Sequence, residues 1–421
     1  MARGLKPSAA IVVTGSELVR GDRRDLNGPF LASSLLGLGI EPARITIVGD
    51  EPAALEAAMR EGLAFDLLVV SGGLGPTHDD RTVELLARAA GVGLELDPEL
   101  ERAIEARSRA VAERLRRPYA DFAEGVRKQA TVPAGAVVAG LAGTAPAFAL
   151  AADGSVATVL PGPPGELQTL WPRVLELEPL RPVLARARAP ERRTLRFFGV
   201  SESQVAQTLA AAGGDGGGVD ATVCARDFEI HVDLVVEPWA TARADELVAR
   251  LSEPLSAYLF SRDEQPVEAV VLSLCRARGL SLATAESCTG GMVAERLTSV
   301  PGSSDVFVGS VVAYADEVKA RELGVAEAVL REHGAVSAET AAAMAQGVRR
   351  RLGADVGVSV TGIAGPGGGS EQKPVGLVYV HAAGPDGELA YDFSFGGDRE
   401  SIRRRATVSA LHLARRLVTE S

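Results

Sequence analysis

Short apolar runs alternate with stretches of helical apolar spacing along the first third of the chain. In the helical stretches the apolar side chains lie three or four positions apart, and most of these stretches end at a glycine. The alternating segments are residues 9–13, 26–38, 44–48, 52–63, 67–70 and 80–90. Apolar strands separated by helices are typical of a buried parallel sheet with crossover helices, so an α/β fold is predicted.

The pattern changes near residue 181, where proline and arginine interrupt it, and a small α+β unit follows. Its predicted elements are a strand at 194–198, a helix at 202–211, strands at 222–226 and 229–237, and a helix at 241–258. A polar stretch at 261–265 marks a second boundary. The predicted domains are residues 1–175, 176–260 and 261–421.

The last segment returns to strands and helices. Predicted strands are residues 280–283, 306–312, 355–360, 377–382 and 388–395, and predicted helices are residues 267–278, 338–352 and a final amphipathic helix. An Asp386-Gly387 turn between the last two strands indicates a hairpin.

Composition narrows the class of protein. The chain has 421 residues, too many for one average domain, and its net charge of -11 argues against direct nucleic-acid binding. The arginine-rich stretches 102–117 and 181–196 are interpreted as solvated faces. Three cysteines make no disulfide framework or metal-type spacing. The basic residues 1–7 precede an apolar stretch too short for a signal peptide, and no membrane span is found, so a cytoplasmic location is expected.

One candidate site is the stretch 285–291 (AESCTGG), which follows an apolar strand and precedes a helix. Ser287 would stand at the carboxyl end of the strand, beside free N–H groups of the next helix. Those around Thr289 and Gly290 could stabilise an oxyanion, typically by about 3–4 kcal/mol per donor. Two interpretations stay open, because Ser287 could equally be only a helix cap. Cys288 is a rival nucleophile, although a cysteine more often packs as a small apolar residue.

A serine hydroxyl needs a base, and no histidine lies in the C-terminal glycine turns. Lys319 is the predicted base if burial or nearby positive charge keeps it neutral, with Tyr314 relaying the proton or orienting the lysine. A second turn at 361–370 (TGIAGPGGGS) follows a buried strand, and its glycines allow close backbone approach to a phosphate or ribose. Together these features suggest a nucleotide-like substrate.

The C-terminal motifs resemble the C-terminal domain of the competence/damage-inducible protein CinA family. They are residues 285–291, 301–304 (PGSS), Tyr314 with Lys319, 334–337 (GAVS), 361–368 (TGIAGPGG) and 373–376 (KPVG). The resemblance implies a three-layer α/β domain that hydrolyses nicotinamide mononucleotide to nicotinate mononucleotide and ammonia without a metal. The family's serine, tyrosine and lysine fall on Ser287, Tyr314 and Lys319. Expected substrate-binding residues are Glu286, Thr289, Gly290, Thr361, Gly362, Ala364 and Gly365.

A second candidate site is the stretch 71–80 (SGGLGPTHDD), which follows the apolar strand 67–70 and opens a helix. Its glycines can cradle a phosphate, and Asp79 and Asp80 can hold a divalent cation. Glu17 lies on the loop after the first strand, at the sheet edge where ligands of open parallel sheets bind. Either aspartate could instead simply cap the helix. A metal–phosphate site is the favoured interpretation.

The N-terminal third resembles the molybdopterin-binding-like (MoaB/MogA) domain of the same family. The motifs are residues 15–18 (GSEL) with Gly21 and Asn27, 72–82, 128–130 (KQA), 143–146 (GTAP) and 160–162 (LPG). The resemblance implies ADP-ribose pyrophosphatase activity with Mg²⁺, Mn²⁺ or Co²⁺. The expected substrate-binding residues are Gly72, Gly73, Gly75, Thr77, Gly143 and Thr144, and the expected metal ligands are Asp79, Asp80 and Glu17. Gly140 and Ala147 depart from the family pattern.

The middle unit resembles the family's KH-like domain, and residues 213–216 (GGDG) fit a Gly-x-x-Gly loop. An acidic residue inside the loop and a strand after it favour a structural spacer over RNA binding. Three functions are therefore compared: a bifunctional pyridine-nucleotide recycling enzyme, a pterin- or molybdopterin-binding module, and a competence or DNA-damage adaptor. The recycling enzyme is favoured, with a homodimer expected and no membrane partner.

Overall fold

The computed structural model describes residues 6–420, and the chain divides into two compact units, Met1–Glu191 and Arg192–Ser421. Residues 1–5 of the basic N-terminus lie outside the described part. The first unit extends beyond the predicted boundary at residue 175, because Leu180 and Val183 pack into its core.

A mixed six-stranded sheet forms the centre of the first unit, in the order β2-β1-β3-β8-β7-β6. Its strands are β1 (Ser8–Thr14), β2 (Glu41–Val48), β3 (Leu67–Ser71), β6 (Val137–Ala142), β7 (Ala145–Ala152) and β8 (Ser155–Leu160). β1 pairs in parallel with β2 and β3, as the alternating pattern predicted, and β3 pairs in parallel with β8, a strand outside the predicted segments. β6 and β7 add an antiparallel edge. They were not predicted, because their alanine- and glycine-rich sequence carries little β-propensity.

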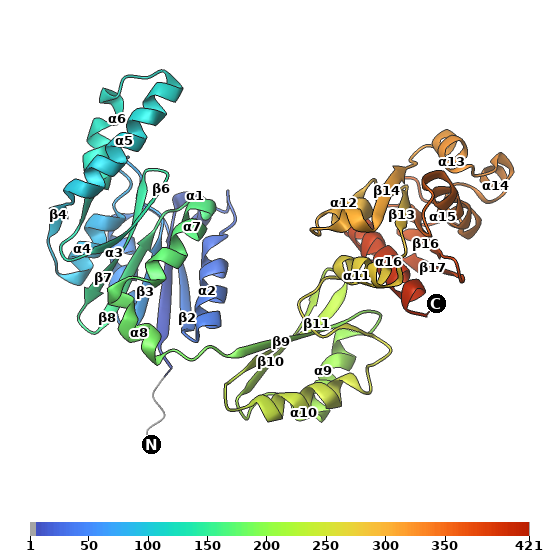
Figure 1. The fold of residues 1–421 in the computed structure, drawn as a ribbon, viewed down its shortest axis with the longest axis horizontal. Helices are drawn as coiled ribbons and strands as arrows, with labels where there is room; N and C mark the ends of the chain where they lie inside the picture. The colour runs from blue at the N-terminus through green and yellow to red at the C-terminus, as the bar shows by residue number, and fades with distance from the viewer. Residues whose placement is uncertain (1–5, 421) are drawn as a thin grey trace. The chain divides into compact units, whose positions relative to one another are not determined.

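Helices cover both faces of this sheet (Figure 1). They are α1 (Ser16–Val19), α2 (Asn27–Leu38), α3 (Pro52–Gly62), α4 (Thr82–Ala90), α5 (Pro98–Leu115), α6 (Ala120–Gln129), α7 (Pro164–Leu175), the 3-10 turn η1 (Glu178–Leu180) and α8 (Arg181–Arg186), with the small strands β4 (Leu94–Leu96) and β5 (Thr131–Pro133). Leu31 of α2 and Leu167 of α7 pack against one face. Met59 of α3 and Leu85 of α4 pack against the other. All four side chains are fully buried, so the crossover helices are fixed by apolar packing.

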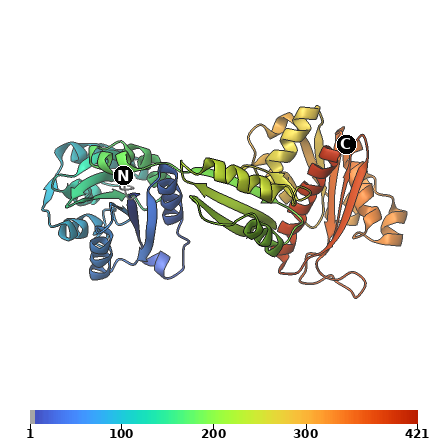
Figure 2. The ribbon, with the colours of Figure 1, turned by 90° about the horizontal axis from the view of Figure 1, so that it is seen from below.

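The second unit begins with a four-stranded sheet in the order β10-β11-β9-β12. Its elements are β9 (Glu191–Phe197), α9 (Glu202–Ala211), β10 (Val219–Arg226), β11 (Glu229–Val236), α10 (Thr241–Ser252) and β12 (Leu259–Ser261). α9 and α10 share one core with the sheet and lie along it in Figure 2. A strand follows the loop at 213–216, as predicted. The predicted helix 241–258 is too long, because the chain leaves the helix after Ser252 to reach β12.

A five-stranded sheet in the order β14-β13-β15-β16-β17 forms the rest of the second unit. The elements are α11 (Val267–Arg278), β13 (Leu282–Glu286), α12 (Met292–Thr298), η2 (Ser303–Asp305), β14 (Phe307–Val312), α13 (Asp316–Leu323), α14 (Glu327–His333), α15 (Ala338–Leu352), β15 (Val356–Gly362), β16 (Leu377–Ala383), β17 (Glu388–Ser394) and α16 (Arg399–Glu420). α11, α12 and α16 share one apolar core with the sheet, and α13 and α15 share another. The domain therefore has three layers.

β13 is the central parallel strand of this sheet, paired with β14 on one side and β15 on the other. The predicted strand 280–283 is too short, because β13 continues to Glu286. The apolar pattern stops before the polar residues at the end of this strand, but these residues are also buried in the structure. This extension places Ser287 directly after the last paired residue.

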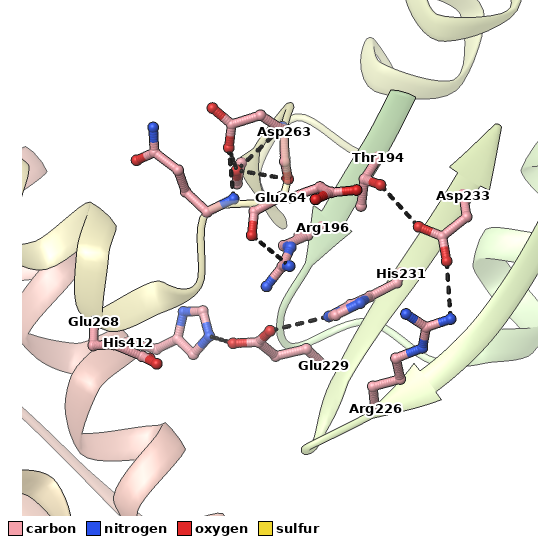
Figure 3. A network of polar contacts seen from close by, with 12 residues as sticks. Thr194, Arg196, Arg226, Glu229, His231, Asp233, Asp263, Glu264, Glu268 and His412 are labelled. Atoms are coloured by element: carbon pink, nitrogen blue, oxygen red, sulfur yellow. Dashed lines mark hydrogen bonds and ion pairs between the residues drawn. The ribbon is translucent and has the colours of Figure 1, made fainter. Parts of the chain in front are cut away.

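A buried polar network joins the middle sheet to α16 (Figure 3). The Glu229 carboxylate meets Nε2 of His412 at 2.8 Å and Nε2 of His231 at 3.2 Å. Burial alone would raise the pKa of Glu229, but the two histidines outweigh it and lower that pKa to about 2. Burial lowers the pKa of His412 to about 4. The carboxylate is thus ionised and hydrogen-bonded at neutral pH.

Among residues 6–420, no helix combines the length and the apolar character that crossing a membrane requires.

Candidate active site

The Ser287 turn is fixed to both neighbouring strands of the C-terminal sheet. The Ser287 N–H donates to the carbonyl of Val360 on β15 at 2.9 Å, and the Ala313 N–H, just after β14, donates to the Glu286 carbonyl at 2.8 Å. Because all three strands are parallel, their carboxyl ends meet at one edge of the sheet. Ser287, Tyr314 and the loop that begins at Thr361 therefore lie at the same edge.

The Glu286 carboxylate lies under the turn. The residue is fully buried, and its oxygens accept from the Thr289 hydroxyl at 2.8 Å and from the N–H groups of Gly291, Val293 and Ala294 at 2.9, 3.0 and 2.9 Å. A carboxylate at a helix N-terminus satisfies donors that the helix itself leaves unpaired. Glu286 and Thr289 were expected to bind substrate, but their side chains hold the turn and the start of α12.

Two backbone N–H groups of the turn remain free. Gly290 was expected to help at an oxyanion, but its N–H donates to the Ser287 carbonyl at 3.1 Å. Within the described residues 6–420, neither the N–H of Cys288 nor that of Thr289 donates to a backbone carbonyl. These two are the available oxyanion donors.

Arg403 orients this turn from α16. Its guanidinium donates to the carbonyls of Cys288 at 3.0 Å and Thr289 at 2.7 Å. A trans peptide points its C=O and its N–H in opposite directions. Holding the Cys288 carbonyl therefore turns the Thr289 N–H away from the arginine. No local motif pointed to Arg403, because it lies 115 positions from Cys288.

Lys319 is buried beside the strand end. It is 1% exposed, and its ammonium donates to the Tyr314 carbonyl at 3.0 Å and meets the Asp316 carboxylate at 3.3 Å. Tyr314 directly follows Ala313, which pairs with Glu286, so the ammonium is held close to the chain position of Ser287. Tyr314 thus orients Lys319 through its carbonyl. Its ring is 59% exposed.

Arg399 links the phenol of Tyr314 to the second glycine turn. It donates to the Tyr314 hydroxyl at 2.9 Å and to the Gly365 carbonyl at 2.7 Å. Gly365 has a φ of 75°, and a Cβ there would lie 2.7 Å from Val375, so the turn requires glycine. Arg399 and Arg403 stand one helical turn apart at the start of α16. The sequence prediction for this helix rested on its apolar residues and did not indicate a role for these arginines.

The remaining predicted residues of this turn differ in exposure. Thr361 is fully buried and its hydroxyl donates to the Ala335 carbonyl at 2.7 Å, so its side chain supports the loop. Ala364 is also buried, and Gly362 is half-buried.

Cys288 is a weak rival to Ser287. Burial raises the pKa of the Cys288 thiol to about 12, so it is protonated at neutral pH. Ser287 is 8% exposed, and among residues 6–420 its hydroxyl has no hydrogen-bond partner. Serine is the nucleophile that the geometry favours.

The first unit places its predicted residues around adjoining hollows. A cavity of about 520 Å³ is lined by Gly72, Gly73, Glu17, Asp79 and Asp80. A Cβ on Gly72, whose φ is 106°, would lie 2.6 Å from the Thr14 carbonyl, so the loop requires glycine.

Thr77, Gly143 and Thr144 line a second cavity of about 900 Å³, together with Glu166. Gly75 lines a third cavity of about 400 Å³ that also includes Asp80. Burial raises the pKa of the Glu166 carboxyl, a residue outside the predicted motifs.

Asn27 is a further polar group at the 520 Å³ cavity. Its amide nitrogen donates to the Ser71 hydroxyl at 2.9 Å and the Gly162 carbonyl at 2.7 Å, while its amide oxygen is buried without a partner. In the sequence, Asn27 was indicated only by its place beside the motif 15–18.

Two of the three predicted metal ligands, Asp79 and Asp80, already contact other side chains of the protein. Asp80 accepts from the N–H and hydroxyl of Thr77, and Asp79 meets His78 at 2.8 Å. Over residues 6–420, no three His, Cys, Asp or Glu side chains are grouped for metal binding. Glu17, Asp79 and Asp80 nevertheless face one cavity, which suits a magnesium-type ion held by one or two carboxylates and substrate phosphates.

The two departures from the family pattern are cross-strand partners. Gly140 on β6 pairs with Ala147 on β7, and Ala147 is fully buried. They belong to the strands of the hairpin. The turn itself keeps Gly143, whose carbonyl accepts from Arg107 at 2.6 Å.

Fold and sites define a chain with a molybdopterin-binding-like α/β unit followed by a CinA-type α/β domain. The family described as "Probable molybdopterin binding domain" matches residues 10–185, and "CinA C-terminal domain" matches residues 264–418. A CinA-like protein from Mycolicibacterium paratuberculosis is 44% identical over 98% of this chain and 99% of its own length. One from Mycobacterium marinum is 43% identical over 98% and 99%. The chain belongs to the CinA family.

A solved structure similar to part of this chain is the competence/damage inducible protein CihA from Agrobacterium tumefaciens. It is 40% identical, with a TM-score of 0.34, and the match covers 36% of this chain and 96% of that one.

Proposed function

We propose that the C-terminal site is a serine amidohydrolase that converts nicotinamide mononucleotide to nicotinate mononucleotide and ammonia. The observation that carries this proposal is the unpaired Ser287 hydroxyl at the sheet edge where the buried Lys319 ammonium is held. Ser–Lys pairs activate serine where no histidine is available. The family resemblance supplies the substrate.

The proposed reaction has two halves. Lys319 first loses a proton from its ammonium group. Its amine then takes the Ser287 hydroxyl proton as Oγ attacks the carboxamide carbon, and the N–H groups of Cys288 and Thr289 stabilise the oxyanion. The C–N bond then breaks, Lys319 returns the proton to the leaving nitrogen, and ammonia departs. Water then attacks the resulting ester and gives a proton to Lys319. The bond between the carbonyl carbon and Ser287 Oγ breaks, Lys319 returns the proton to Oγ, and nicotinate mononucleotide is released.

Product identity tests this proposal. The full chain is incubated with nicotinamide mononucleotide and, separately, with nicotinamide riboside, and the products are resolved by liquid chromatography and mass spectrometry. We expect nicotinate mononucleotide and equimolar ammonia from the nucleotide, and slower turnover of the riboside. Unchanged nucleotide at high enzyme concentration would overturn the proposal.

For the first unit we propose a metal-dependent ADP-ribose pyrophosphatase. Gly72, Gly73, Glu17, Asp79 and Asp80 on one cavity support it, because a divalent ion would there neutralise the diphosphate. The chain's own residues would approach the phosphates through the glycine backbone and hold the ion through the carboxylates.

The competing function is binding of a molybdopterin, which the family match to residues 10–185 favours. AMP release from ADP-ribose with Mg²⁺, Mn²⁺ or Co²⁺ discriminates between the two. We expect release that falls sharply in Asp79→Asn, with Asp153→Asn, an exposed aspartate on the β7–β8 turn, as the matched control. Saturable pterin binding without any AMP release would replace the pyrophosphatase proposal.

A further inference from the structure

Aromatic side chains gather where the middle sheet meets α16. The chain has 11 phenylalanines, and Phe198, Phe228, Phe260, Phe393 and Phe395 all take part in ring contacts here. His412 stacks on Phe198 at 3.8 Å between ring centroids. In a chain with only 4% aromatic residues, this concentration marks a specialised junction.

A cavity of about 490 Å³ lies at this junction, inside the second unit. Its aromatic walls are Phe198 and Tyr258 from the middle part and Tyr391 and Phe393 from β17. The size lies within the range of small-molecule and cofactor sites, about 300–1,000 Å³. The cavity is distinct from the Ser287 edge, whose residues do not line it.

Three polar atoms at this cavity lack partners. Ser409 Oγ, His412 Nδ1 and Arg415 Nε are buried without a hydrogen bond, although Ser409 and His412 are only 2% and 1% exposed. Glu229 occupies the other ring nitrogen of His412, as Figure 3 shows. Buried polar groups normally have partners, so a ligand that supplies them is expected.

The cavity also carries unbalanced positive charge. Glu420 is paired with Arg416 at 3.0 Å, and Glu229 is held by its two histidines. No carboxylate among residues 6–420 forms an ion pair with Arg415, whose guanidinium instead lies 5.8 Å from the centre of the Phe260 ring. A partly buried guanidinium without a carboxylate is a natural partner for an anionic group.

We propose that this cavity binds a nucleoside monophosphate, with its base against the Tyr391 and Phe393 rings and its phosphate on Arg415. Ser409 donates its hydroxyl proton to the ligand, and His412 Nδ1 accepts a hydrogen bond from it. A planar heterocycle joined to an anion matches a cavity that combines aromatic walls with an unpaired arginine.

Photolabelling tests the site directly in the full chain. 8-Azidoadenosine 5′-monophosphate is irradiated with the protein, and labelled peptides are mapped by mass spectrometry. We expect label on β17 or on the segment that contains Tyr258, and competition by AMP but not by adenosine. Label confined to peptides of the Ser287 edge or the first unit would overturn the proposal, as would equal competition by adenosine.

Variants separate binding from folding. Arg415→Met and Tyr391→Ala should each lower the label on these peptides at least ~10-fold. Tyr391 is 43% exposed, so its replacement tests the site even if Arg415→Met fails to fold. Arg404→Met, an exposed arginine on the same helix, is the matched control and should label like the parent chain. Undiminished label in Tyr391→Ala would contradict the proposal.

Discussion

Replacing Glu286 with glutamine should loosen the Ser287 turn and weaken the domain. The Glu286 carboxylate accepts hydrogen bonds from Thr289, Gly291, Val293 and Ala294, all at 3.0 Å or less. Glutamine keeps one oxygen, which can retain three of these bonds if it takes the place of Oε2. The amide nitrogen then faces the Ala294 N–H, and that donor is left unpaired in a buried site.

The magnitude follows from these contacts. A hydrogen bond to a charged group contributes about 1.5–3 kcal/mol, and a buried unpaired donor costs about 1–3 kcal/mol. Together they predict that Glu286→Gln lowers the free energy of unfolding by roughly 2.5–6 kcal/mol. Misplacing the nucleophile by about 1 Å can cost ~10²-fold in rate, so kcat should fall by about that factor.

Two assays check this prediction. Thermal unfolding followed by circular dichroism reports stability, and ammonia release reports kcat. Glu295→Gln is the matched control, because Glu295 is exposed on α12, the helix whose start Glu286 holds, and should change neither stability nor kcat. A Glu286→Gln chain with the parent's unfolding midpoint and kcat would refute the role given to this carboxylate.

Three further predictions concern the second unit. Burial lowers the pKa of His412 from 6.5 to about 4. Between these pH values the imidazole is therefore protonated in the unfolded chain and neutral in the folded chain. The free energy of unfolding therefore has its full value with respect to His412 above pH 6.5. It falls by about 1.4 kcal/mol per pH unit as the pH is lowered toward 4. Urea unfolding should show this slope in the parent and not in His412→Gln. Cys288→Ala should retain ammonia release, and thiol reagents should affect the variant and the parent alike, since the Cys288 thiol is buried and protonated. Loss of activity in a folded Cys288→Ala chain would make the sulfur the nucleophile. Arg403→Met should lower kcat more than it raises KM, because the arginine orients the turn; a change in KM alone would place Arg403 on the substrate.

Much of the fold could be predicted because its strands are apolar and its helices end at glycines. The helix 202–211 and the helix 338–352 match α9 and α15. The place of Ser287 at the carboxyl end of its strand followed from the apolar run before it, which needs no knowledge of side-chain direction.

The direction of each polar side chain could not be predicted. Glu286 and Thr289 stand in the Ser287 motif and Thr361 opens the second glycine turn, yet their side chains are buried and bind backbone or one another. Whether a polar group faces a ligand or the core depends on tertiary contacts. Arg399 and Arg403 were missed for the same reason, since their partners come from distant loops.

Ammonia release from nicotinamide mononucleotide by Ser287→Ala and Lys319→Met tests the central claim most directly. Ser304→Ala, an exposed serine of the same domain, is the control. The Ser–Lys assignment predicts that both variants lose at least ~10³-fold in kcat while Ser304→Ala keeps the parent rate. Folded Ser287→Ala and Lys319→Met chains that release ammonia at the parent rate would contradict it.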